Sequence, residues 1–160
     1  MATITHTVAI NAAFLQEIKE DNRELRQLLD QAEAMLSSPW PARTPIHQLV
    51  DLLGSLRDQL AMHFTLEEAY GYFDEALTVE PRLSEQAGEL REEHQILFLD
   101  MCDLVDLAEQ QLYCEPAPTN RLLQLALRFD EFHYQLMEHE SRETELIQQA
   151  FHDDDIGVGD

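Results

Sequence analysis

Apolar residues recur at intervals of three and four along four long stretches of the chain, and polar residues fill the positions between them. Because a helix turns about 100° per residue, residues spaced in this way share one face. The pattern predicts four amphipathic helices, over residues 11–37, 45–78, 83–112 and 119–151. The period-two alternation that would indicate strands is nearly absent.

Prolines interrupt the pattern between the predicted helices, because proline lacks the backbone N–H and clashes with the preceding helical turn. They are Pro39 and Pro41 at the first connection, Pro81 at the second, and Pro116 and Pro118 at the third, whereas Pro45 starts the second helix. The two ends of the chain lack the helical period. We therefore expect residues 1–10 to form an N-terminal arm and residues 152–160 a loop-like tail.

Four helices joined by short connections favour an antiparallel arrangement of neighbours. We predict an all-α, up-down-up-down antiparallel four-helix bundle, and a single domain over residues 1–160. A chain of 160 residues is long enough for one hydrophobic core. Leu, Glu, Gln and Ala, which form helices readily, dominate its composition.

Histidine and glutamate interrupt the apolar stripes at one level of the predicted bundle. The residues at this level are Asn22 in the first helix, His63 and Glu67 in the second, His94 in the third, and His139 and Glu143 in the fourth. A buried carboxylate without a partner is strongly unfavourable. Arginines lie only on the flanks of the stripes and are poorly placed to neutralise this layer. Imidazole and carboxylate together suit iron, manganese or zinc, so we interpret the layer as a metal site.

Charge and composition limit the classes of partner and the cellular location that are expected. Asp and Glu number 32 against ten basic residues, for a formal charge of −22. Such a charge repels nucleic acid and anionic membrane surfaces, so neither is expected as a partner. No signal peptide and no apolar run of about 18 residues is present, which makes the cytoplasm the expected location. Cys102 and Cys114 form neither a disulfide framework nor a zinc-type pair.

The histidine and glutamate spacing is similar to that of a known family. The motifs are His63-x-x-x-Glu67, His94, His139-x-x-x-Glu143, and Glu67-Glu68 followed by Gly71-Tyr72-Phe73. Together they resemble the hemerythrin-like (HHE cation-binding) domains, the last of them the bacterial members in particular. The resemblance runs over essentially the whole chain.

The resemblance implies a carboxylate-bridged iron centre, with two ions expected and one ion, or manganese or zinc, as alternatives. Glu67 and Glu143 would bridge the ions. His63 would bind one ion, and His94 and His139 the other. O2, peroxide or NO would bind at open positions, so that the protein would bind or sense these molecules or handle iron.

Two positions depart from the family pattern. Asn22 stands where the family has a first-helix histidine, and Phe98 stands where oxygen-carrying hemerythrins have a second histidine in the third helix. A pure oxygen carrier is therefore not expected. The amide oxygen of Asn22 or the carboxylate of Asp21 would complete the site, and His133, at the edge of the fourth stripe, is a weaker candidate.

The missing histidine motivates a different class of function. The layer could be a hydrogen-bonded His/Glu network in a metal-free or single-metal bundle that acts as a protein-interaction or regulatory module, with an unidentified partner. A di-iron oxidase or peroxidase is a third hypothesis. No nucleophile motif or glycine-rich phosphate loop supports an enzyme, so an enzymatic function is not favoured.

Overall fold

The computed structural model describes residues 2–37, 45–69, 81–114 and 119–159. These residues form the helices α1 (Ala2–Ser37), α2 (Ile46–Ala69), α4 (Ser84–Leu112) and α5 (Thr119–Gly159), with a short 3-10 helix, η1 (Pro81–Leu83), before α4. No strand occurs in these ranges. The predicted all-α class is confirmed.

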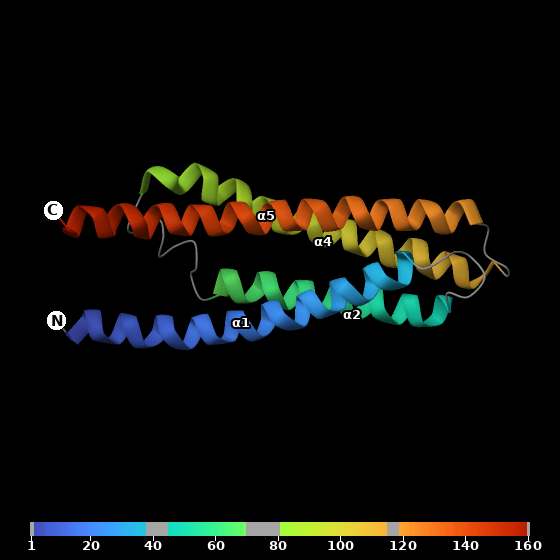
Figure 1. Ribbon diagram of the computed structural model, residues 1–160, viewed down its shortest axis with the longest axis horizontal. Coiled ribbons are helices and arrows are strands. Elements are labelled where there is room, and N and C mark those ends of the chain that lie inside the picture. The colour runs from blue at the N-terminus through green and yellow to red at the C-terminus, as the bar shows by residue number, and fades with distance from the viewer. Residues whose placement is uncertain (1, 38–44, 70–80, 115–118, 160) are drawn as a thin grey trace.

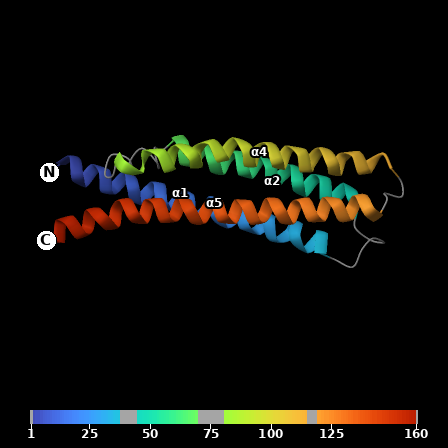
Figure 2. The ribbon, with the colours of Figure 1, turned by 90° about the horizontal axis from the view of Figure 1, so that it is seen from above.

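The four long helices run alternately up and down (Figure 1). Each packs against the next in the chain, and α1 also packs against α5, which closes the bundle. Both termini lie at the same end, as the views from the side and from above agree (Figures 1 and 2). This is the predicted up-down-up-down four-helix bundle. Its antiparallel helices bring residues that are far apart in the sequence into one layer across the bundle.

The outer helices are longer than expected. α1 begins at Ala2, not at Asn11, and α5 continues to Gly159 instead of ending near residue 151. Neither extension contains proline, and adding a residue to an existing helix is much easier than starting one. The expected arm and tail are therefore helical. Residues 70–78, expected to complete the second helix, lie outside the described residues.

Leucine dominates the core on one side of the polar layer. Leu49, Leu53, Leu56 and Leu60 of α2 are fully buried at helical spacing. A second, smaller apolar cluster of Leu83, Ala87, Leu90 and Leu146 lies on the other side. The polar layer is thus enclosed between two apolar clusters. None of the described helices combines the length and apolar character needed to cross a membrane.

Core packing predicts the effect of leucine truncation. Leu53→Ala removes a side chain that is 0% exposed and should lower the free energy of unfolding by about 2–5 kcal/mol, through lost burial and the cavity left behind. Leu127→Ala, at a side chain 70% exposed, is the control and should change it by less than about 0.5 kcal/mol. Urea unfolding followed by circular dichroism measures both. Equal losses would contradict this assignment of the core.

Candidate metal centre

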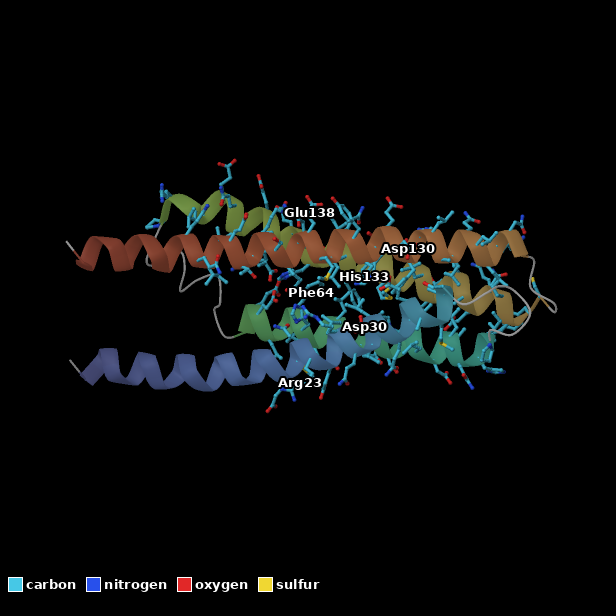
Figure 3. The ribbon with its side chains drawn as sticks, in the orientation of Figure 1. Arg23, Asp30, Phe64, Asp130, His133 and Glu138 are labelled. Atoms are coloured by element: carbon cyan, nitrogen blue, oxygen red, sulfur yellow. The ribbon has the colours of Figure 1, made fainter. Side chains whose placement is uncertain are left out.

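Six polar side chains from all four helices are buried at one level of the bundle. They are Asp21 from α1, His63 and Glu67 from α2, His94 from α4, and His139 and Glu143 from α5. Each residue is 6% exposed or less. Phe64, labelled in Figure 3, lies inside the bundle beside them.

Helical spacing explains why these residues face inward. On α5, His139 and Glu143 lie three and seven residues after the buried Leu136, so all three share its inner face. On α2, His63 and Glu67 stand in the same relation to Leu60. The polar groups therefore replace leucine within otherwise apolar stripes.

A first cluster, which we call cluster 1, consists of Glu67, His94, His139 and Glu143. The ligand atoms of these residues all lie within 4.8 Å of one another. His94 Nε2 is 2.9 Å from Glu143 Oε1 and 3.1 Å from Glu67 Oε2. His139 Nε2 contacts Glu143 Oε1 as well. Two imidazoles and two carboxylates thus converge on one point.

A second cluster, which we call cluster 2, consists of His63, Glu67 and Glu140. His63 Nε2 lies 2.8 Å from Glu67 Oε1 and 2.6 Å from Glu140 Oε1. Glu67 therefore belongs to both clusters, with Oε1 toward His63 and Oε2 toward His94.

A carboxylate outside the clusters binds the Nδ1 atom of each histidine. The pairs are His63 with Asp21 at 2.5 Å, His94 with Glu68 at 3.1 Å, and His139 with Glu93 at 2.9 Å. A carboxylate at Nδ1 favours the tautomer that carries its proton there, which leaves the Nε2 lone pair for a ligand on the inner side. Metal-binding histidines are typically held in this way.

Two of these carboxylates are themselves fixed. Gln59 Nε2 donates a hydrogen bond of 2.7 Å to Asp21 Oδ1. Arg142 donates one of 2.5 Å to Glu93 Oε1. Each of the imidazole rings of His63 and His139 is therefore oriented by a carboxylate that is itself held by a second side chain.

Two buried atoms of cluster 1 have no hydrogen-bond partner: Glu67 Oε2 and His139 Nε2. Both lie close to an atom of another cluster residue, but not in hydrogen-bonding geometry. Ligands about 2.1 Å from one ion and at right angles to each other lie about 3.0 Å apart, which matches the 2.8–3.1 Å separations in the clusters. The donor set and its spacing fit a cation.

The family model described as the Hemerythrin HHE cation binding domain matches residues 13–151. The chain belongs to this family. The match spans every residue of both clusters. Comparison with curated proteins and with solved structures gave no match.

The structure of this hemerythrin-domain protein brings five of the six proposed ligands together. They are His63, Glu67, His94, His139 and Glu143. The sixth, Asn22, is exposed and belongs to neither cluster, whereas its neighbour Asp21 is buried against His63. Glu143 belongs to cluster 1 only.

Sequence reasoning missed Glu140 as a member of a cluster. It lies four residues after the buried Leu136 and three before Glu143, at the edge of the α5 stripe. That spacing was a signal for an inward-reaching side chain. His133, the weaker candidate, lies 3.4 Å from Glu33, outside both clusters.

The electrostatics of the layer favour positive charge. Burial alone lowers the pKa of His94, but hydrogen bonds with Glu143, Glu67 and Glu68 outweigh it and raise the pKa to about 10. Burial also lowers the pKa of His63, but hydrogen bonds with Asp21, Glu140 and Glu67 outweigh this effect and raise the pKa. Protonated imidazoles therefore neutralise the carboxylates in the metal-free hemerythrin domain.

A bound cation would replace these protons. Burial raises the pKa of Glu67, but contacts with His63 and His94 outweigh it and lower the pKa to about 2. Burial and the neighbouring carboxylates Glu67 and Glu140 raise the pKa of Glu143, despite its contacts with His139 and His94. Metal binding should therefore release protons from the imidazoles.

The metal-free protein is expected to lose stability as pH rises from about 6.5 to about 10. His94 has a folded pKa of about 10 against an ordinary value of 6.5, so its charge stabilises the fold fully below the lower value and progressively less up to the higher one. The melting temperature of chelator-treated protein should therefore fall, by about 2–4 °C for each kcal/mol lost.

Two comparisons isolate the cause of this decline. Metal-loaded protein should show a smaller decline, because bound metal requires neutral imidazole. His94→Gln should make the decline smaller without abolishing it, because the pKa of His63 is raised as well, whereas His47→Gln, at an exposed site on α2, should leave it unchanged. Circular dichroism between about pH 6 and pH 10 measures all four. A melting temperature that rises with pH in the metal-free protein would contradict the expectation.

Proposed function

We propose that this hemerythrin-domain protein binds iron in a carboxylate-bridged, two-ion centre and uses it in the cytoplasm to bind or sense O2, peroxide or NO. The position of Glu67 carries the proposal. Its Oε1 lies 2.8 Å from His63 Nε2 in cluster 2, and its Oε2 lies 3.1 Å from His94 Nε2 in cluster 1. One carboxylate faces both clusters, as a bridging ligand does. Manganese and zinc accept the same donors and are the alternative metals.

The other side chains divide between the two ions. His94, His139 and Glu143 would hold one ion together with Glu67, and His63 and Glu140 the other. Bound iron would supply open coordination positions for a diatomic molecule or peroxide. Asp21, Glu68 and Glu93 would keep the three imidazole rings oriented.

The surroundings supply both exclusion of water and a route of approach. Leu90 and Leu97 flank His94 on α4, so apolar side chains border the centre above and below. The Phe64 ring stacks on the His94 ring, with centroids 4.1 Å apart and planes 12° apart. An open groove of about 670 Å³ between α2 and α4 is lined by Phe64, His94 and Phe98, among others. It would let a small molecule approach from the His94 side.

Removing a ligand should lower metal binding. Glu143→Ala deletes a carboxylate that contacts two imidazoles, so we expect iron affinity to fall by at least about 10- to 100-fold, the loss typical of changes just outside a metal's ligands. Iron per chain and near-ultraviolet ligand-to-metal absorption, after identical anaerobic loading, measure the effect. Glu138→Ala on the same helix is the control, because Glu138 is exposed on the outer side of the bundle (Figure 3).

Two results would overturn the proposal. One is wild-type protein that holds less than about half an ion per chain after iron loading, with a melting temperature that a chelator does not change. That result would favour a metal-free interaction module. The other is equal iron binding by wild type, Glu143→Ala and Glu138→Ala, with the fold intact by circular dichroism.

A further inference from the structure

We infer that Glu140 replaces the ligand that Asn22 does not supply, and that the two cation sites consequently differ in affinity, so that the protein passes through a stable one-ion form. The inference rests on the proposed function and concerns how the centre is filled. Its basis is the difference in number, type and burial of the donors in cluster 1 and cluster 2.

Among the α1 side chains that the structure describes, residues 20–37, none offers a free ligand atom to cluster 2. Asn22 is exposed. Asp21 is buried, but both of its oxygens are engaged: Oδ2 with His63 Nδ1 at 2.5 Å and Oδ1 with Gln59 Nε2 at 2.7 Å. Asp21 therefore orients the His63 ring and does not face the space where an ion would lie.

Glu140 fills this corner from the opposite helix. It follows His139 directly, and consecutive helical residues differ in direction by about 100°, so His139 is directed to cluster 1 and Glu140 to cluster 2. Glu140 Oε1 reaches to 2.6 Å from His63 Nε2. The Glu140 side chain is 29% exposed, against 2% for His63. One side of cluster 2 is therefore open to water.

The donors make cluster 1 the stronger site. It has two imidazoles and two carboxylates, all buried, whereas cluster 2 has one imidazole, the shared Glu67 and the partly exposed Glu140. Imidazole binds iron well, and fewer protein ligands leave more positions to exchangeable water. An ion in cluster 1 also withdraws charge from Glu67 and repels a second cation. The second ion should thus bind more weakly and leave first.

This asymmetry would link the centre to metal supply. At low free iron the protein would hold one ion in cluster 1, and only higher free iron would complete the bridged pair. The ability of the centre to bind a small ligand across two ions would then depend on iron concentration.

Anaerobic titration of metal-free protein with ferrous iron tests the inference, with isothermal calorimetry for affinity and elemental analysis for ions per chain. Wild type should show two steps, the second at least about 10-fold weaker. Glu140→Gln retains the size of the side chain but loses its charge, and should weaken the second step by about 10- to 100-fold and leave the first unchanged. Glu138→Gln, exposed and two residues away on α5, is the matched control and should behave as wild type.

Asp21→Asn provides a second, independent variant. It should weaken the second step and leave the first, because the weaker contact at Nδ1 holds the His63 ring less firmly. Asn22→Ala should change neither step. Far-ultraviolet circular dichroism and the melting temperature verify that each variant is folded.

The outcomes separate this inference from the proposed function. If wild type binds no iron, both fail. If wild type binds two ions and folded Glu140→Gln also binds two with unchanged affinities, or loses both equally, only the inference fails. Two wild-type steps of equal affinity would overturn the asymmetry as well.

Discussion

The constraint on which the rest of the structure depends is the burial of carboxylates inside an apolar bundle. Glu67 and Glu143 are 3% and 2% exposed, and charge at such positions is strongly unfavourable unless cationic partners surround it. The three histidines meet this need in the metal-free state, when protonated, and a metal ion would meet it after the protons leave. The inward face of the layer is therefore built for positive charge.

The contacts that neutralise the buried carboxylates also fix the orientation of the imidazole rings. Each imidazole is held on its outer edge by a carboxylate, and two of those carboxylates are anchored in turn by Gln59 and Arg142. Apolar clusters on both sides leave the rings little room to rotate. A site held in this way orders its donor atoms before a ligand arrives, which reduces the entropy lost on binding.

The two clusters differ in how far the bundle encloses them and in the helices that supply their ligands. Cluster 1 is enclosed, and its ligands come from α2, α4 and α5. Cluster 2 lies where α1 approaches α2, and α1 contributes a residue that orients a histidine instead of one with a free donor atom. The departure from the family pattern at Asn22 thus has a local structural counterpart in Asp21 and Glu140.

The sequence by itself determined the helical class, the bundle and the inward position of His63, Glu67, His94, His139 and Glu143, because helical periodicity is a local property of the chain. Tertiary structure alone decided between Asp21 and Asn22, which differ by about 100° in direction, since only packing against α2 sets the rotation of α1. It also decided that Glu140 reaches His63. Residues at the edge of a stripe can face a neighbouring helix or water, and helix spacing, which no local pattern encodes, selects between them.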